Sequence, residues 1–227
     1  MKIIAIHQPK KPLLHWILQL DDGSKMELAE STLVAHQLAV GDELTESDLT
    51  ELQTASDEYI LLDAALHFLA ARPRSRQEVR RRLLRPRPGK RPPDPATVDR
   101  VLERLSELEY LSDREFAGFW VENRDQFSPR SARAMRHELA QRGVDRETLD
   151  ATLDSDLDAE RAMRAARQRL RSVAGLDYQA FARRLSGFLL RRGFGYDVAR
   201  ETVRALWLES HGGVPDDVAG APRVEDE

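Results

Sequence analysis

Arginine is the residue type whose number and spacing could do chemistry in this chain, and that chemistry is the binding of anions. Residues 72–91 contain ten basic side chains and one acid, Glu78. Residues 161–192 contain nine basic side chains and one acid, Asp177. A guanidinium binds phosphate or carboxylate oxygens through two parallel hydrogen bonds. Two segments so unbalanced favour contact with phosphates or an acidic protein surface over a solvated helix face.

Positive charge is confined to the middle of the chain. The formal net charge is −4, but residues 57–209 carry +5 between a segment 1–56 with −5 and a segment 210–227 with −4. This distribution is typical of a protein whose central part binds a polyanion or an acidic partner.

The residue types of catalysis and metal binding lack the necessary patterns. The six histidines are scattered without metal-ligand spacing, and the chain has no cysteine. The sequence contains no glycine-rich loop of the Walker or dinucleotide type. We therefore expect a protein that is not an enzyme and uses no cofactor or metal.

Composition also bears on the compartment. Absence of cysteine fits a reducing cytosol. The apolar stretch Leu13 to Leu20 is far shorter than the roughly 20 residues that span a bilayer. We expect a cytoplasmic protein with no membrane contact.

Helices must position the arginines, because the pattern from Asp57 onward is helical. Apolar residues recur at spacings of three and four between Ile60 and Leu69. Ser75 to Glu78 has the form of a capping box. Asp94-Pro95 and Ser128-Pro129 combine an N-cap residue with a proline, which predicts two further helix starts.

The helical part is a repeat. The residues four and eight positions after Asp94, Asp145 and Gly195 are apolar in all three segments. Arg-Gly-apolar tripeptides at 142–144 and 192–194 predict glycine C-caps after two of the second helices. Apolar pairs four residues apart mark the second helices: Val79 and Leu83, Met135 and Leu139, Leu185 and Leu189. Such a period predicts a stacked array.

The N-terminal segment has a different pattern. Lys2 to His7, Leu13 to Leu20 and Lys25 to Leu28 read as strands, with a tight turn at Asp21-Asp22-Gly23, and a short helix follows from Glu30 to Leu38. The predicted fold class is mainly α, with three tandem three-helix, helix-turn-helix-like repeats after a small β-hairpin-containing unit. The expected boundaries are 1–56 for that unit, 57–111, 112–155 and 156–209 for the repeats, and 210–227 for a disordered acidic tail.

Two features leave alternatives. Phe116, Phe119, Trp120 and Phe127 could stack on nucleic-acid bases, but the helical spacing of the first three favours core packing for the group. Arg124 is either a ligand contact or a cap for its own helix.

The repeats also resemble helix-turn-helix units, so recognition of DNA bases must be considered. Helix 77–84 has one amide, Gln77, and then mostly arginine, whereas base readers usually combine arginine with short polar side chains. Sequence-specific DNA binding is therefore not expected.

An ordered set of short motifs resembles the RecX family, small bacterial regulators of the RecA recombinase. The set consists of Arg72-Pro73-Arg74-Ser75, Tyr110-Leu111-Ser112-Asp113, Glu138-Leu139 with Arg142-Gly143-Val144, and Arg191-Arg192-Gly193-Phe194. The resemblance covers about residues 64–206, and no single motif is specific by itself. The sequence departs from the family in the proline-rich connection 85–93, where members generally have a short turn.

The resemblance implies a regulator that binds the RecA nucleoprotein filament, without catalytic residues of its own. We expect the protein to be a monomer. It would modulate the filament's ATPase and strand exchange in recombinational DNA repair, with inhibition as the expected direction. Single- or double-stranded DNA is a further candidate partner. The alternatives are a general DNA-binding protein and an adaptor for another protein. Candidate contacts are Arg72, Arg74, Arg76, Arg80, Arg81, Arg82, Arg124, Arg130, Arg133, Arg183, Arg184, Arg191 and Arg192.

Overall fold

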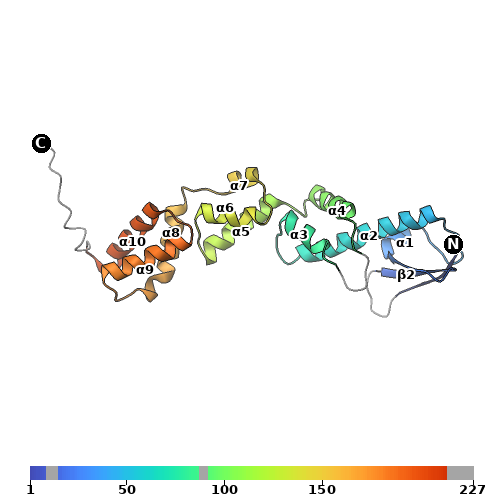
Figure 1. Cartoon of the computed structure of the whole chain (residues 1–227), viewed down its shortest axis with the longest axis horizontal. Helices are drawn as coiled ribbons and strands as arrows, with labels where there is room; N and C mark the ends of the chain where they lie inside the picture. The colour runs from blue at the N-terminus through green and yellow to red at the C-terminus, as the bar shows by residue number, and fades with distance from the viewer. Residues whose placement is uncertain (9–14, 87–91, 214–227) are drawn as a thin grey trace. The chain divides into compact units, whose positions relative to one another are not determined.

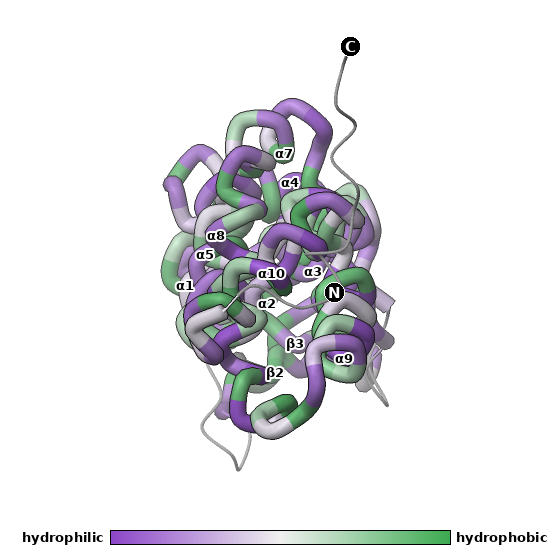
Figure 2. The backbone as a smooth tube through the Cα atoms, turned by 90° about the vertical axis from the view of Figure 1, so that its left-hand side faces the viewer, coloured by the Kyte–Doolittle hydropathy of each residue, from purple (hydrophilic) through white to green (hydrophobic). Residues whose placement is uncertain are grey.

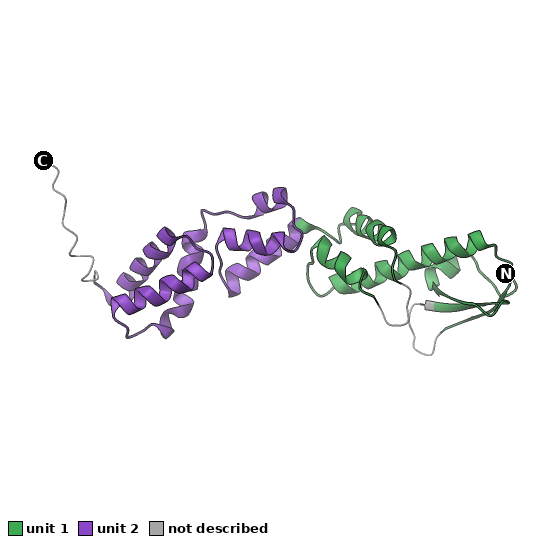
Figure 3. Cartoon of the chain, in the orientation of Figure 1, with its two compact units in different colours: residues 1–113 green, residues 114–227 purple. Residues whose placement is uncertain are grey.

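The chain divides into two compact units, Met1–Asp113 and Arg114–Glu227 (Figure 3). The structure, a computed structural model, describes residues 1–8, 15–86 and 92–213. It is mainly helical, with a small antiparallel sheet near the N-terminus (Figure 1). Most of the proline-rich connection and of the expected acidic tail lies outside the described residues.

Unit 1 begins with a three-stranded antiparallel sheet of order β1-β2-β3. The strands are β1 (Ile3–His7), β2 (His15–Leu20) and β3 (Lys25–Ala29). Gly23 has φ +84° in the turn between β2 and β3, a conformation that glycine adopts at little cost. The expected strands and turn are confirmed within the described residues. The helix α1 (Glu30–Ala35) follows and ends earlier than Leu38.

One long helix, α2 (Glu46–Leu69), serves both the sheet and the first repeat. Leu52 packs in the core of the sheet, and Leu61 packs in the core of the repeat. Buried Ser56 accepts a hydrogen bond from the backbone N–H of Ala29 at 2.7 Å. The boundary expected at 56/57 therefore falls inside a continuous helix. That helix starts at Thr45, which forms a capping box with Asp48.

The first repeat is completed by α3 (Arg76–Leu83) and α4 (Pro95–Glu107). Ser75 accepts a hydrogen bond from the N–H of Glu78, and Asp94 accepts one from the N–H of Thr97. Both predicted helix starts are confirmed. The three helices enclose a core of nine buried apolar side chains: Leu61, Ala65, Val79, Leu83, Val98, Val101, Leu102, Leu105 and Leu111.

Unit 2 contains the second and third repeats. The second comprises α5 (Asp113–Phe127), α6 (Ala132–Ala140) and α7 (Arg146–Thr152). The third comprises α8 (Asp158–Arg169), a 3-10 turn (Leu170–Ser172), α9 (Tyr178–Arg191) and α10 (Tyr196–His211). Hydrophobic and hydrophilic residues alternate along these helices (Figure 2), and the apolar ones form one core per repeat.

The predicted internal repetition is confirmed by burial. The apolar pairs of the second helices are all at most 2% exposed, and the matched positions of the third helices are at most 8% exposed. Gly143 and Gly193 have φ +85° and +90°, as the C-caps require. Val144 and Phe194, the residues after them, are buried in the cores of their repeats.

Two expectations are wrong. Ser128-Pro129 does not start a helix, because α6 begins three residues later with Ser131 as its N-cap. Phe127 does not pack in the core. It is 65% exposed at the end of α5, whereas Phe116 is fully buried and Trp120 is partly buried. The spacing that predicted core packing covered Phe116, Phe119 and Trp120 but not Phe127.

Candidate anion-binding surfaces

In unit 1, two arginines of α3 are neutralised within their own repeat. Arg80 donates from Nε and Nη2 to the carboxylate of Asp99 on α4, at 2.7 and 3.2 Å. The paired hydrogen bonds and charges raise the pKa of Arg80 and lower that of Asp99. Arg76 donates to Glu103 at 2.7 Å and to Ser106 at 3.2 Å. Arg80 and Arg76 are therefore already paired with acids of α4, and a partner would have to compete with those acids.

Two of the remaining candidates of unit 1 lie over the ring of Phe68. The guanidinium of Arg74 lies 4.2 Å from the ring centroid, and that of Arg82 lies 5.9 Å from it. Burial and the charge of Arg72 lower the pKa of Arg74. Arg72 itself pairs with Glu78 at 3.6 Å. Arg81 and Arg82 are exposed, and neither makes an ion pair with another described residue.

In unit 2, the second repeat gathers arginines around one carboxylate, that of Glu138 on α6. Its Oε2 accepts hydrogen bonds from Trp120 Nε1 at 2.8 Å and Arg124 Nε at 2.9 Å. Its Oε1 pairs with Arg130 at 3.0 Å. The guanidinium of Arg124 also lies 4.6 Å from the centroid of Trp120. Arg124 therefore does not cap its helix in this structure but belongs to a cationic cluster.

The third repeat adds two arginines to the same region. Arg192, at the end of α9, donates from Nη1 to the carbonyl of Pro129 at 2.8 Å and to Ser128 at 3.2 Å. The guanidiniums of Arg192 and Arg169 lie 4.5 and 4.9 Å from the ring centroid of Phe188. Burial, followed by the charges of Arg130, Arg169 and Arg124, lowers the pKa of Arg192. The structure therefore brings positive charges from two repeats close together.

Other arginines of segment 161–192 have structural roles. Arg161 is 1% exposed and donates to Asp125 at 2.9 Å and to the carbonyl of Asp154 at 2.6 Å. Arg167 pairs with Glu209 at 2.9 Å. The high positive charge that the sequence gives this segment is therefore partly neutralised by acids outside it.

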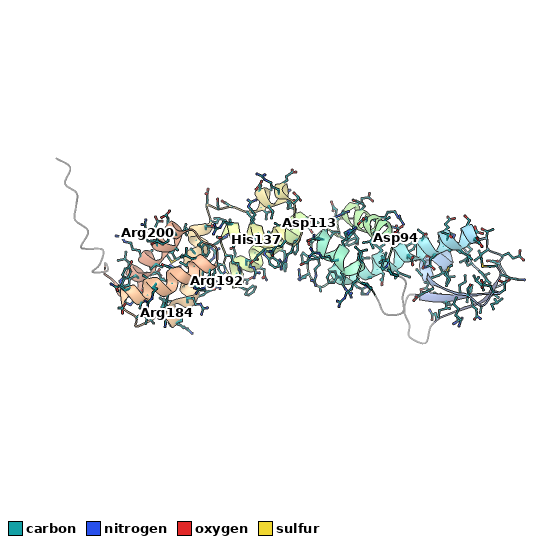
Figure 4. All side chains as sticks on the ribbon, in the orientation of Figure 1. Asp94, Asp113, His137, Arg184, Arg192 and Arg200 are labelled. Atoms are coloured by element: carbon teal, nitrogen blue, oxygen red, sulfur yellow. The ribbon has the colours of Figure 1, made fainter. Side chains whose placement is uncertain are left out.

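The other candidate arginines of unit 2 are exposed. Arg183 and Arg184 lie in the middle of α9, where Figure 4 labels Arg184. Arg191 lies at the end of α9, and Arg133 lies on α6. None of these four makes an ion pair with another described residue. Glu138, Arg142 and Arg169 were not among the candidate contacts named from the sequence. Arg142 was visible as part of an Arg-Gly-apolar cap, and its guanidinium lies 4.0 Å from the centroid of Trp120.

The described residues offer neither a metal site nor a membrane span. Within residues 1–8, 15–86 and 92–213, no group of histidine and carboxylate side chains could hold a metal ion. In the same ranges, no helix is long and apolar enough to cross a membrane.

A tandem array of three-helix repeats with arginine-rich surfaces defines a class of binding scaffold, and comparisons identify the family. Profiles of the first, second and third three-helix domains of RecX match residues 62–85, 112–153 and 156–203, which together make up half of the chain. The chain therefore belongs to the RecX family of regulatory proteins. Membership implies regulation of RecA and suggests a non-enzymatic role.

Individual relatives agree with this assignment, and solved structures agree with the fold. The regulatory protein RecX of Bacillus subtilis is 28% identical over 211 residues, which cover 92% of this chain and 78% of the relative. RecX of Listeria innocua is 26% identical over 203 residues, covering 88% and 74%. A crystal structure of regulatory protein RecX superposes with a TM-score of 0.62 at 21% identity, covering 87% of this chain and 96% of the other. RecX from Lactobacillus salivarius gives 0.55 at 21%, covering 68% and 99%.

Proposed function

We propose that this protein binds the RecA nucleoprotein filament and restrains its ATPase and strand exchange, acting as a monomer in the cytoplasm. Family membership supports RecA as the target. The observation that carries the proposal on this chain is the set of exposed arginines on α3, α6 and α9 without ion-pair partners among the described residues. Those arginines are Arg81, Arg82, Arg133, Arg183, Arg184 and Arg191.

Unpaired exposed arginines suit a filament because they leave charge available to a partner. A guanidinium held by a carboxylate of its own repeat must lose that pair before it binds another anion, whereas Arg81 and Arg82 need only lose water. A repeat array presents such side chains from several modules at once. A filament of protein and DNA offers both phosphates and acidic side chains to them.

The test is the single-strand-dependent ATPase of RecA, measured with increasing amounts of this protein. We expect the rate to fall, and the fall to persist when single-stranded DNA is supplied in large excess, because the protein acts on the filament itself. An inhibition that disappears with excess DNA would instead favour a general DNA-binding protein that competes for the strand. An unchanged rate in both conditions would contradict the proposal.

A further inference from the structure

We propose that Arg124, Arg130, Arg169 and Arg192 form a phosphate-binding site for single-stranded nucleic acid at the junction of the second and third repeats. Glu138 acts there as an internal counter-anion with which the ligand's phosphates compete. The inference rests on the proposed function and names the part of unit 2 that contacts single-stranded nucleic acid. It is tested without RecA, so that its failure is distinguishable from failure of the proposed function.

The first support is the crowding of positive charge. Arg124 and Arg130 reach the carboxylate of Glu138 from α5 and from the α5–α6 connection. Arg192 is held against that connection by its bonds to Ser128 and Pro129. Arg169 shares the ring of Phe188 with Arg192. Among the described residues, Glu138 is the one carboxylate that contacts any of these four guanidiniums. An oxyanion between them would relieve their mutual repulsion.

The second support is an unused donor. The Nε of Arg130 is buried and has no hydrogen-bond partner among the described residues. A buried donor without an acceptor costs about 1–3 kcal/mol, so a bound oxyanion that supplied the acceptor would recover that cost. Arg169 is exposed and makes no ion pair with a described residue, which leaves its charge available at the rim of the cluster.

The third support selects nucleic acid over an acidic protein surface. Trp120 and Phe188 are covered by guanidiniums, but Phe127 is 65% exposed and has no ring partner in the described part of the chain. Phe127 lies seven residues after Trp120 and three after Arg124 on α5, so helical spacing places it on the stripe that carries the cluster. An exposed ring beside closely spaced guanidiniums can stack a base while its phosphates are neutralised.

Substitution of Glu138 distinguishes phosphate binding by the cluster from a purely structural role of the cluster. If the cluster has only a structural role, Glu138 is an essential partner of its arginines. Loss of Glu138 should then weaken both the fold and the binding of nucleic acid. If the cluster binds phosphates, the carboxylate competes with them, and its neutralisation strengthens binding. Glu138→Gln keeps one oxygen that can accept from Trp120, removes the charge and replaces the other oxygen with an amide NH2 group.

The experiment is fluorescence anisotropy of a labelled oligothymidine with the full chain, over a range of salt concentrations and without RecA. We expect Glu138→Gln to tighten binding by roughly threefold to tenfold, from the removal of one nearby charge at an effective surface dielectric. Arg130→Ala combined with Arg169→Ala should weaken binding and reduce the slope of log K against log salt by about 1.4, at ~0.7 per lost phosphate contact.

Two single variants complete the set. Phe127→Ala should weaken binding by roughly tenfold, through loss of one base stack. Arg146→Ala is the matched control, since Arg146 is a 93% exposed arginine on α7 outside the cluster, and it should bind as the unmodified protein does. Circular dichroism and the unfolding midpoint of each variant report whether it is folded.

Two results would overturn the proposal. The first is weaker oligothymidine binding by folded Glu138→Gln, which would make the cluster structural. The second is unchanged binding of oligothymidine by Phe127→Ala and by the Arg130 and Arg169 double variant. If that double variant bound assembled RecA filaments more weakly at the same time, the cluster would be assigned to an acidic protein surface instead.

Discussion

The arginines of unit 1 and unit 2 differ in what faces them. In the first repeat, α4 carries Asp99 and Glu103 opposite α3, so Arg80 and Arg76 are paired one to one. In unit 2, Glu138 is shared by arginines of one repeat while arginines of the next lie close by. Similar densities of arginine in the sequence therefore leave different amounts of charge for a partner.

The two units also hold their parts together by different means. In unit 1 the sheet and the first repeat share the continuous helix α2. In unit 2 the two repeats meet through side chains and a tight backbone approach. Arg161 of α8 binds Asp125 of α5, and an added Cβ at Gly193 would lie 2.6 Å from Ser131 and 2.7 Å from Ala134. Single substitutions should therefore separate the repeats of unit 2 more readily than the parts of unit 1.

The largest expected effect is at Arg161. Replacing it with methionine should lower the free energy of unfolding of unit 2 by about 2–4 kcal/mol, because Asp125 and the carbonyl of Asp154 both lose the buried guanidinium that donates to them. Chemical denaturation followed by circular dichroism measures the change. Arg164→Ala is the control, since Arg164 also pairs with Asp125 but is 43% exposed, and it should cost at most ~1 kcal/mol. Equal effects of the two substitutions would show that Arg161 does not hold the repeats together.

Gly193→Ala should follow in size. The substitution combines a positive φ with the clash against Ser131 and Ala134, and we expect a loss of roughly 2–4 kcal/mol. Gly212→Ala is a matched comparison, with φ +70° and no neighbour within 4 Å, so only about 1 kcal/mol should be lost. Thermal unfolding of both variants gives the comparison, and similar midpoints would argue against close packing at the junction.

The third prediction contrasts paired with unpaired arginines of α3. Arg81→Ala with Arg82→Ala should weaken binding to RecA filaments by roughly threefold to tenfold without lowering the unfolding midpoint, because both side chains are exposed. Arg80→Ala should leave filament binding unchanged and lower the unfolding midpoint, since Asp99 loses its bidentate partner. Filament co-sedimentation and thermal unfolding distinguish the two. A drop in binding for Arg80→Ala alone would mean that its pair with Asp99 opens for the partner.

The smallest effect is the pH dependence of that pair. Hydrogen bonding to Arg80 depresses the pKa of Asp99 in the folded state, so its stabilisation is present above the ordinary aspartate pKa of about 3.9 and is lost as pH falls through the lower folded value. The unfolding midpoint of Asp99→Asn should therefore differ less between neutral and acidic pH than the midpoint of the unmodified protein does. A gap as wide as in the unmodified protein would place the acid sensitivity elsewhere, for example at the N-caps Asp94 and Asp145, whose pKa values are also lowered.

The repeats could be predicted from the sequence because their signals are local. Apolar pairs four residues apart and Arg-Gly-apolar caps follow from helix periodicity and C-cap geometry, and they located the core of each repeat. The long helix α2 was missed because the pattern was read only from Asp57, although Thr45 provides a capping box.

The arginine partners could not be predicted because they are separated along the chain. Asp99 is nineteen residues from Arg80, and Asp125 is thirty-six residues from Arg161. A count of charges along the sequence does not show which acid lies opposite a guanidinium, because that depends on the angle at which the helices pack. Glu138 was visible only as part of a family-like motif, and its role in the cluster could not be predicted because it depends on Trp120 and on the connection that carries Arg130.

The most direct test of the account is the equilibrium affinity of the full chain for RecA filaments assembled on single-stranded DNA, with excess free DNA present. We predict saturable binding that weakens when Arg81, Arg82, Arg183 and Arg184 are replaced together by alanine and stays unchanged in Arg146→Ala. Absence of binding, or equal binding by the fourfold variant, would contradict the claim that unpaired exposed arginines join this protein to the filament.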